Sequence, residues 1–277
     1  MADDPIAFWN GPGAARWVTQ QARFDRAFAA HGELAMAQAG LATRTRVLDV
    51  GCGCGGTTLS LGARVAPGTV LGVDVSAPML GRAKERAAGI ANVSFVNADA
   101  TTHAFEPGSF DVVFSRFGVM FFTDPVRAFG NLRASMAPGA RLSCVVWRTQ
   151  RENPWMDEAA RDLGDLVQIP PQASADEPGP FSFGDPDRVR RILGDAGFRD
   201  VELTPHDPMA VLSEGSDRED ALQTTMAIGL VGRALQEADE ATRERAKEPL
   251  LRWVERHVGP DGIRVPTAVW VLTARGN

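Results

Sequence analysis

The chain has 277 residues, of which 44% are hydrophobic, and a formal net charge of −6 at pH 7. Its 29 basic residues form no run dense enough to follow a phosphate backbone, so a nucleic-acid substrate is not expected. Three cysteines cannot build a disulfide framework, and neither a run of about 20 apolar residues nor a signal-peptide pattern is present, so a cytoplasmic protein without a membrane span is predicted.

Strand and helix patterns alternate along the chain, which predicts one α/β domain over residues 1–277, with a largely parallel sheet and helices on both of its faces. The N-terminal segment 1–42 is expected to be helical. Strands are expected at about 46–50, 69–74, 93–97, 111–115, 140–147, 200–204 and 264–275.

Start and stop signals bound several of the helices between these strands. Asp124-Pro125 and Asp185-Pro186 each offer an N-cap followed by a proline at the first helical position, and Ser76 can cap the helix after the second strand. Pro138-Gly139 is expected to end one helix and Gly197 to end another.

Two segments exceed a minimal sheet of this kind. The first, 148–184, is rich in Pro, Asp and Glu, and the second, 213–262, contains a charged helical pattern. We expect both to be insertions that form a cap over the substrate, although ordinary surface elaboration would give the same pattern.

A glycine-rich turn follows the first strand, at 51–56. Such a turn lets backbone N–H groups approach a nucleotide-like ligand without interference from a Cβ atom. Gly51, Gly53 and Gly56 match the dinucleotide spacing G-x-G-x-x-G, whereas Asp49, Gly51, Gly53 and Gly55 match the acidic-x-G-x-G-x-G of S-adenosylmethionine enzymes. The glycines alone leave both assignments open.

Acidic residues at the ends of three successive strands favour the second template. Asp49 stands where dinucleotide enzymes usually carry an apolar residue, Asp74 ends the second strand, and Asp99 follows the third. Both templates expect a carboxylate roughly 20 residues after the glycine turn, in the position of Asp74, and in both this carboxylate accepts from ribose hydroxyls.

With these motifs, the chain resembles the class I S-adenosylmethionine-dependent methyltransferases, in particular the small-molecule group that includes the ubiquinone and menaquinone enzymes. The resemblance is close over about 9–147 and looser beyond. It implies a Rossmann-like doubly wound seven-stranded sheet whose last strand is antiparallel. It also implies S-adenosylmethionine as the cofactor, held by the following residues: Asp49, Gly51, Cys52, Gly53, Gly55, Asp74, Val75, Met79, Asp99, Ala100 and Ser115.

The substrate side is less defined by sequence. Arg116 could orient an anionic substrate or hold a carboxylate at a helix end. Apolar residues near the end of the fourth strand and in the flanking segments could line a pocket for an apolar or aromatic metabolite, or could be ordinary core. With Arg116, these candidates are Trp9, Phe117, Met120, Phe121, Trp155 and His257.

No catalytic base is assigned. The histidines are His31, His103, His206 and His257, so the loops after the fourth and fifth strands supply no imidazole, which argues against an O-methylation base there. His31 or His257 could still reach the site, although a surface or structural role is favoured for each. Cys52 and Cys54 are too few for a structural zinc, so no metal is expected.

The prediction is therefore a methyltransferase acting on a small molecule, with an O, N or C acceptor left open and no assignment of oligomeric state. Two alternatives remain. The chain could bind S-adenosylmethionine for another purpose, since a fold does not fix a function. It could also be a nicotinamide-dependent oxidoreductase, although Asp49 and Asp99 argue against that template.

Overall fold

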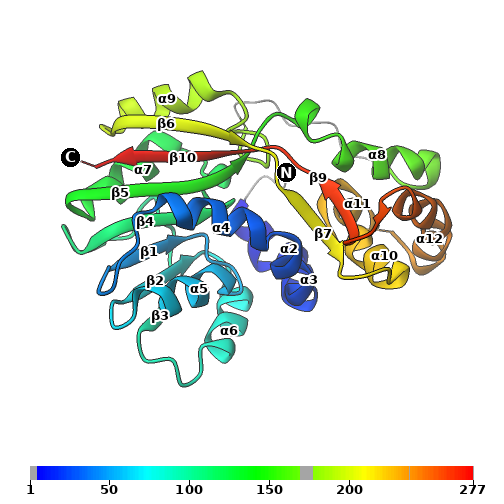
Figure 1. The fold of residues 1–277 in the computed structure, drawn as a ribbon, viewed down its shortest axis with the longest axis horizontal. Coiled ribbons are helices and arrows are strands. Elements are labelled where there is room, and N and C mark those ends of the chain that lie inside the picture. Colours follow the sequence, from blue (N-terminus) through cyan, green and yellow to red (C-terminus); the bar gives the residue numbers. More distant parts are fainter. Residues whose placement is uncertain (1–4, 169–176, 237, 277) are drawn as a thin grey trace.

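A seven-stranded sheet forms the centre of the computed structural model, which describes residues 5–168, 177–236 and 238–276 (Figure 1). The strand order is β3-β2-β1-β4-β5-β10-β6, and β10 runs antiparallel to both of its neighbours. The predicted fold class and antiparallel last strand are confirmed. The strands are β1 (Val47–Val50), β2 (Val70–Asp74), β3 (Val93–Asn97), β4 (Phe110–Arg116), β5 (Met136–Trp147), β6 (Arg199–His206) and β10 (Val269–Arg275).

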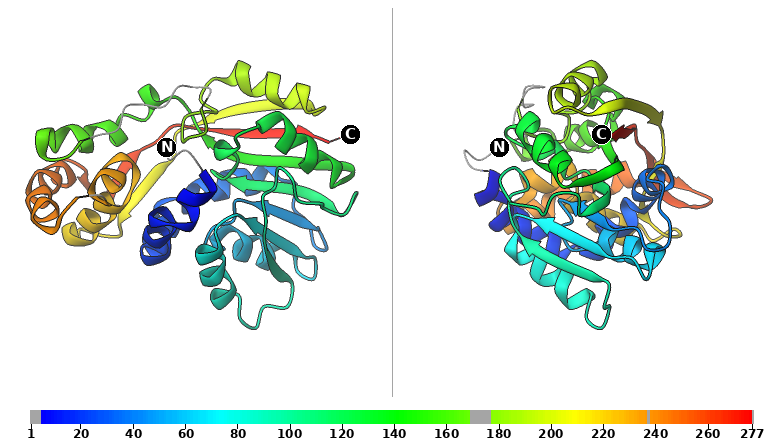
Figure 2. Two further views of the ribbon diagram at one scale, coloured as in Figure 1. Left: turned by 180° about the vertical axis from the view of Figure 1, so that it is seen from behind. Right: turned by 90° about the vertical axis from the view of Figure 1, so that its left-hand side faces the viewer.

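Helices cover both faces of this sheet, as the alternating pattern predicts. On one face, α4 (Ala29–Gln38) packs against β4, β5 and β10, and α5 (Gly56–Val65) against β1 to β3. On the other face, α7 (Pro125–Ala134) and α9 (Pro186–Asp195) pack together (Figures 1 and 2). β1 lies between the two layers and is buried at every position, as expected of a central parallel strand.

The predicted helix starts are confirmed in detail. The Ser76 side chain accepts from the Met79 N–H at the start of α6 (Ala77–Arg86), and the Asp124 and Asp185 carboxylates accept from backbone N–H groups in the first turns of α7 and α9. Each cap satisfies a donor that the first turn leaves without a partner. Gly197 follows the end of α9 with φ +86°, so that stop signal is confirmed as well.

The expectation that Pro138-Gly139 ends a helix is wrong. Helix α7 already ends at Ala134, and β5 begins at Met136. The register between β4 and β5 shifts between the pairs Phe110–Met136 and Val112–Arg141, which leaves Pro138 and Gly139 in a bulge. A bulge accepts a proline without an N–H donor and a glycine with φ +78°, so this dipeptide interrupts a strand and not a helix.

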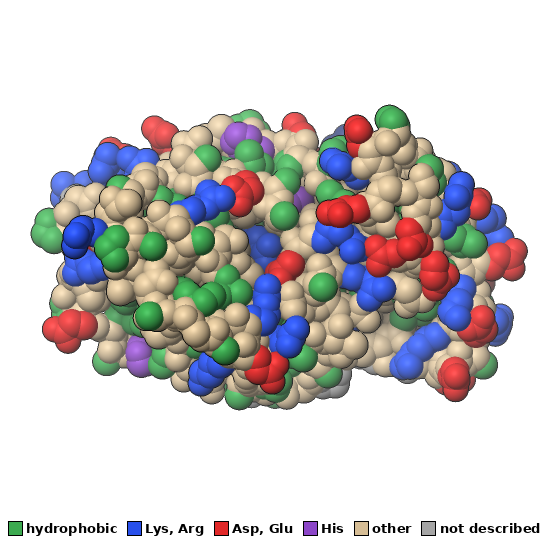
Figure 3. Space-filling view, turned by 60° about the horizontal axis from the view of Figure 1, so that its bottom comes forward, with side chains coloured by type: hydrophobic (Ala, Val, Ile, Leu, Met, Phe, Trp, Pro, Cys, Tyr) green, Lys and Arg blue, Asp and Glu red, His purple; other side chains and the backbone are tan. Residues whose placement is uncertain are grey.

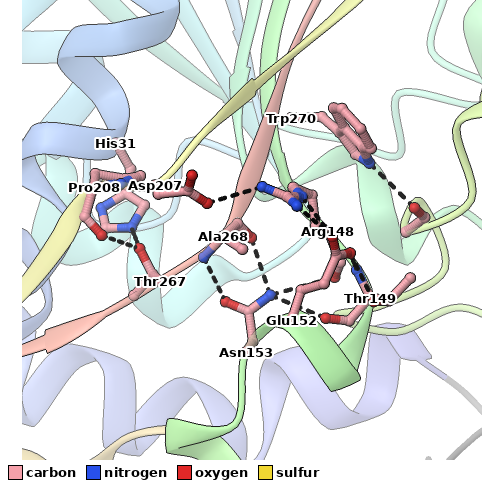
Figure 4. Close-up of polar contacts among 11 residues, drawn as sticks. His31, Arg148, Thr149, Glu152, Asn153, Asp207, Pro208, Thr267, Ala268 and Trp270 are labelled. Carbon is pink, nitrogen blue, oxygen red and sulfur yellow. Dashed lines mark hydrogen bonds and ion pairs between the residues drawn. The ribbon is translucent and has the colours of Figure 1, made fainter.

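The predicted single strand at 264–275 is also divided. Its first part is β9 (Gly262–Pro266), which pairs with β7 (Met209–Ser213) and β8 (Val258–Gly259) in a separate three-stranded sheet. At the break, the Asn153 side chain donates from Nδ2 to the Ala268 carbonyl at 3.0 Å and accepts from the Ala268 N–H at 2.8 Å (Figure 4). This amide replaces a strand partner where the chain passes from one sheet to the other.

The helices of the two insertions form one body at the end of the molecule opposite the chain's C-terminus, at the right of Figure 1, whereas Ser182 of the first insertion hydrogen-bonds the Met120 carbonyl beside the central sheet. Helix α8 (Trp155–Asp162) from the first insertion packs on α11 (Gly229–Gln236) and α12 (Glu240–Glu255) from the second, and α10 (Arg218–Ala227) packs on α12. We call these four helices, with the sheet β7-β9-β8, the cap. Short 3-10 turns complete the chain at Val119–Phe121, Gln150–Glu152 and Gly164–Leu166. Residues 169–176 of the first insertion and residue 237 of the second lie outside the described residues.

The N-terminal segment is helical, as predicted, over most of its described residues, and its last helix ends at Gln38. It comprises α1 (Pro5–Asn10), α2 (Pro12–Thr19), α3 (Gln21–Ala27) and α4. Helix α2 packs on α6, and α3 packs on β7 of the cap. These short helices therefore lie between the central sheet and the cap (Figures 1 and 2). None of the helices in the described segments is long and apolar enough to span a membrane.

Candidate functional site

A cavity of about 380 Å³ lies at the carboxyl ends of the strands β1, β2 and β4, and the N-terminal helices close it from the other side. Ligands in open α/β sheets bind at this edge, where the strand order reverses on the two sides of β1. Most of the wall is apolar, and a few carboxylate, hydroxyl and guanidinium groups face into it. A cavity of this composition is the usual form of a small-molecule site.

Two of the three motif glycines form the floor. Gly51 (φ +67°) and Gly53 (φ +55°) line the cavity, and both adopt the left-handed conformation that glycine allows. Gly55 has φ +80° and does not line the cavity. A Cβ atom at Gly55 would lie 3.0 Å from Ala83 Cβ, so this glycine allows the start of α5 to pack closely against α6.

Asp74 connects the ends of β1 and β2. Its carboxylate accepts from the Gly53 N–H and from the Ser76 N–H, both at 2.8 Å, and the side chain lines the cavity. Burial raises its pKa, and the two backbone hydrogen bonds oppose this rise. Each oxygen keeps a further lone pair, so Asp74 can still accept from a diol in the cavity. Cys52, Val75 and Met79 line the same wall.

Asp99 and Ala100 line the cavity beyond β3, as the resemblance implies. The Asp99 carboxylate accepts from the Thr101 N–H at 2.8 Å, which fixes its loop in an Asx turn. Its second oxygen has no partner among the described residues and can accept from a ligand. Asp74 and Asp99 thus offer carboxylate oxygens to the same cavity from two neighbouring loops.

Asp49 and Ser115, which the resemblance assigns to the cofactor, lie behind the cavity wall. Asp49 is fully buried and accepts from the hydroxyls of Thr57 at 2.7 Å and Thr58 at 2.6 Å. Burial raises its pKa to about 6, and these hydroxyls oppose the rise. Ser115 donates from its hydroxyl to the Val50 carbonyl at 2.8 Å and accepts from the Gly118 N–H at 3.2 Å. Both residues therefore hold the floor in position instead of lining it.

Arg116 lines the cavity, but Asp25 already engages its guanidinium. Its Nη2 lies 3.6 Å from Asp25 Oδ1, and its Nη1 donates to the Phe28 carbonyl at 3.4 Å. Asp25 also accepts from Arg86 at 2.8 Å and lies against Gly56, at the start of α5. Of the two interpretations of Arg116, the structure favours the one in which it holds a carboxylate at a helix end. Burial lowers the pKa of Arg116, and Asp25 opposes this effect.

Aromatic residues form the outer wall of the cavity. The rings of Trp9 and Phe121 meet edge to face at a centroid distance of 5.2 Å, and Trp17 lies 6.4 Å from Trp9. Phe117 also lines the cavity and stacks on Trp147, with centroids 4.3 Å apart. The predicted apolar pocket thus includes Trp9, Phe117 and Phe121.

The other predicted substrate residues lie elsewhere. Met120 is buried beneath the wall, where its sulfur accepts from the Trp147 N–H. Trp155 lines a small crevice within the cap, together with Met156 and Trp253. His257 packs on Trp253 at 4.3 Å, and its Nδ1 hydrogen-bonds the Trp253 carbonyl at 2.9 Å. No residue of the described cap lines the cavity, and the role of the two insertions as a cap over the substrate stays a prediction.

His31 is buried between the rings of Phe28, Phe117 and Trp147. Its Nε2 lies 2.9 Å from the Thr267 hydroxyl, which donates to the Pro208 carbonyl at 2.6 Å (Figure 4). Because that hydroxyl proton is committed, Nε2 must be the donor. Burial and the nearby Arg116 charge lower the pKa of His31 to about 3, so the ring is neutral and structural.

The cavity residues that sequence reasoning missed come mainly from the N-terminal helices. Trp17, Gln21, Phe24 and Asp25 line the cavity from α2 and α3. Their only signal in the sequence is the cluster of aromatic residues in a predicted helical segment. Groups of three or more potential metal ligands are absent from the described residues.

Comparison with known proteins agrees with this geometry. Residues 47–139 match a family model described as a methyltransferase domain. A demethylmenaquinone methyltransferase from Staphylococcus aureus is 37% identical over 111 residues, which cover 40% of this chain and 46% of the relative. The chain thus spans about half the length of the curated relatives that it matches.

Two solved structures share the fold. Phosphoethanolamine N-methyltransferase 2 from Haemonchus contortus, in complex with S-adenosyl-L-methionine, superposes with a TM-score of 0.58 at 19% identity, over 99% of this chain and 58% of that one. An S-adenosylmethionine-dependent methyltransferase from Aquifex aeolicus gives a TM-score of 0.51 at 21% identity, over 68% and 91%. The sheet order, the glycine turn and the matched domain together identify this chain as carrying a class I S-adenosylmethionine-dependent methyltransferase domain.

Proposed function

We propose that the cavity binds S-adenosylmethionine and that the protein transfers the cofactor's methyl group to a small, apolar or aromatic metabolite. The observation that carries this proposal is the arrangement of Gly51, Gly53, Asp74 and Asp99 around one cavity with an aromatic outer wall. The matched domain favours this function over a nicotinamide-dependent oxidoreductase.

The residues present fit such a cofactor. Gly51 and Gly53 would let the cofactor lie close to the backbone of the glycine turn, because neither carries a side chain. Asp74 would accept from the ribose hydroxyls, and Asp99 would accept from the adenine amino group. When bound, S-adenosylmethionine supplies a sulfonium methyl group that a nucleophile can displace. The chain's own contribution is to orient the acceptor, to exclude water and to hold the cofactor.

The aromatic wall and the histidine positions bear on the acceptor. Trp9, Phe117 and Phe121 present ring faces and edges to the cavity, which suits an apolar or aromatic molecule. No histidine is among the described residues that line the cavity, and His31 lies behind Phe117. This favours an acceptor atom that is nucleophilic without losing a proton to an imidazole.

The three cysteines are free and buried, which fits a cytoplasmic location.

Calorimetric titration with S-adenosylhomocysteine, with NAD as the matched control, tests the cofactor. We expect micromolar binding of S-adenosylhomocysteine alone, and binding of NAD alone would overturn the assignment. Asp74→Ala should weaken S-adenosylhomocysteine binding at least tenfold, because the variant loses the ribose acceptor and leaves the Gly53 N–H without its partner. Asp195→Ala, at the exposed end of α9, removes the same charge and should bind as the wild type does.

Binding alone does not separate a methyltransferase from a protein that uses S-adenosylmethionine for another purpose. Transfer of labelled methyl groups to a library of apolar and aromatic acceptors makes that separation. Transfer that disappears in Asp74→Ala and persists in Asp195→Ala would support the proposal. Tight cofactor binding with no transfer to any acceptor would favour the alternative.

A further inference from the structure

The Asn10 side chain, at the end of α1, joins this helix to the loop that follows β2. Its Nδ2 donates to the Val75 carbonyl at 3.0 Å, and its Oδ1 accepts from the Ala77 N–H at 3.0 Å. Nδ2 also donates to the Ile6 carbonyl, within α1, at 2.9 Å. The nitrogen and the oxygen of this exposed amide are therefore both engaged by backbone groups, on two different segments of the chain.

The loop that Asn10 binds carries the candidate ribose acceptor. Asp74 and Val75 line the cavity, and the Asp74 carboxylate accepts from the Ser76 N–H. Asn10 binds on both sides of Ser76, at the carbonyl before it and at the N–H after it. The Ala77 N–H lies in the first turn of α6, where no carbonyl of the helix is available to it, so Asn10 supplies its partner.

The helix that Asn10 holds forms part of the cavity wall. Ile6 and Trp9, both on α1, line the cavity. The Trp9 ring meets Phe121, in the 3-10 turn after β4, edge to face at 5.2 Å. Because β2, β1 and β4 are neighbours in the sheet, α1 reaches across the end of β1, where the glycine turn begins.

Other parts of the N-terminal segment are held by stronger contacts. On α3, the Asp25 carboxylate accepts from Arg86 at 2.8 Å, Arg86 also donates to the Cys54 carbonyl, and Arg26 pairs with Asp220 of the cap at 2.6 Å. Figure 3 views the molecule from the side of α3 and α6, and basic and acidic side chains lie next to one another across the middle of this face. Charged, partly buried pairs are stronger than bonds of a neutral, exposed amide, so α1 is held less firmly than α3.

We propose that Asn10 is a positioning residue that latches α1 across the cavity, and that the cofactor enters and leaves when this latch is open. This inference rests on the proposed function. An asparagine suits the role, because its amide presents a donor and an acceptor side by side to the carbonyl and the N–H of the loop. The bonds join atoms of the chain alone, so the latch forms whether the cavity is empty or filled.

Loss of the latch should therefore speed both the entry and the departure of the cofactor. A side chain that contacted the cofactor directly would change mainly its departure. Surface plasmon resonance with the immobilised full chain and S-adenosylhomocysteine measures both rates. In Asn10→Ala the association and dissociation rate constants should each rise at least about fivefold, because both bonds to the loop are lost. The dissociation constant, which is their ratio, should change less than about threefold.

Asn92→Ala is the matched control. The Asn92 Nδ2 likewise donates to two backbone carbonyls, those of Gly62 at 2.9 Å and Gly68 at 3.0 Å, and it joins two segments that do not line the cavity. This variant loses the same kind and number of bonds, so any general loosening of the fold is matched. Both rate constants should stay at their wild-type values.

A double substitution separates the latch from an effect on the loop. If Asn10 acts by holding α1, Asn10→Ala should have little further effect in a Trp9→Ala background, because the part of the wall that the latch retains is already lost. An equal effect of Asn10→Ala in both backgrounds would assign its role to the loop that carries Asp74, and would overturn the inference.

The remaining outcomes separate this inference from the proposed function. Binding of S-adenosylhomocysteine with the same two rate constants in wild type and Asn10→Ala would overturn the latch and leave the proposed function intact. A rise in the dissociation rate constant alone, or an equal rise of both in Asn92→Ala, would overturn the latch as well. Failure of wild type to bind would overturn the proposed function and the latch with it. If Asn10→Ala does not fold, Asn10→Ser, whose hydroxyl is too short to reach both groups, gives the same comparison.

Discussion

A Cβ atom placed on Gly51 would lie 2.6 Å from the Cα atom of Gly118. The turns after β1 and β4 therefore meet backbone against backbone beneath the cavity. Ser115 joins them, because its hydroxyl donates to the Val50 carbonyl and accepts from the Gly118 N–H. The floor of the candidate site thus depends on two glycines that are 67 positions apart in the sequence.

Replacement of Gly51 by alanine should damage both stability and cofactor binding. The new Cβ would overlap Gly118, and the residue would have to keep φ +67°. Overpacking and a left-handed alanine together predict a loss of at least about 2 kcal/mol in the free energy of unfolding. Chemical denaturation measures this loss, and calorimetry with S-adenosylhomocysteine should show binding at least tenfold weaker.

Gly130→Ala is the matched control, because this glycine lies within α7 and a Cβ there would meet no atom within 4 Å. Alanine should be neutral or should stabilise the helix by up to about 1 kcal/mol. Equal effects of the two substitutions would contradict the backbone contact between Gly51 and Gly118.

The features that the sequence predicts well are local. Ser76, Asp124 and Asp185 cap helices because each cap depends on residues only two or three positions away. The glycine turn and the strand that precedes it form a similarly short motif. Such features follow from backbone stereochemistry and are read directly from neighbouring residues.

The features that the sequence does not predict depend on long-range packing. Asp25 enters the cavity wall from α3 because it pairs with Arg86 and Arg116, residues 61 and 91 positions further on. Trp155 belongs to the core of the cap, because the two insertions pack on each other. The division between β9 and β10 depends on Asn153, more than 100 positions earlier. No local pattern encodes these contacts.

Asp49 should make the stability of the protein depend on pH. Its pKa is about 6 in the folded protein and 3.8 as the reference value, so the folded state binds the proton more tightly. The stabilisation of the folded state by the protonated Asp49 carboxyl is complete below about pH 4 and is lost as pH rises through 6. A difference of about two pKa units corresponds to about 3 kcal/mol.

Asp49→Asn removes this titration and keeps an acceptor for the Thr57 and Thr58 hydroxyls. Urea denaturation at pH 4 and pH 8, without cofactor, should show the variant gaining about 3 kcal/mol relative to wild type at the higher pH. The comparison between proteins cancels the other titrating groups. A stability difference that is the same at both pH values would show that Asp49 is not a strained buried carboxylate.

His31 should produce the opposite pH dependence. Its pKa is about 3 in the folded protein and 6.5 as the reference value, so the unfolded state takes up the proton first. The contribution of the neutral His31 ring to the stability of the folded protein is complete above about pH 6.5 and falls as pH decreases towards 3. Between pH 7.5 and pH 4.5 the loss is about 3 kcal/mol.

His31→Leu tests this prediction. At pH 7.5 the variant should be less stable by about 1 kcal/mol, because it loses the hydrogen bond to Thr267. At pH 4.5 it should be the more stable protein, since no buried imidazole remains to be protonated. Equilibrium unfolding at the two pH values measures the crossover, and parallel losses in both proteins would rule out a neutral buried His31.

Phe121 should contribute to the acceptor more than to the cofactor. Its ring meets Trp9 edge to face in the aromatic part of the cavity wall. Phe121→Ala removes a large apolar surface, so kcat/KM for an apolar acceptor should fall about tenfold or more, which corresponds to about 1.4 kcal/mol. Binding of S-adenosylhomocysteine should change less than about threefold, and His257→Gln, in the cap, should leave both quantities unchanged. If Phe121→Ala weakens S-adenosylhomocysteine as much as it reduces kcat/KM, the aromatic wall belongs to the cofactor, and the acceptor must contact a different part of the cavity.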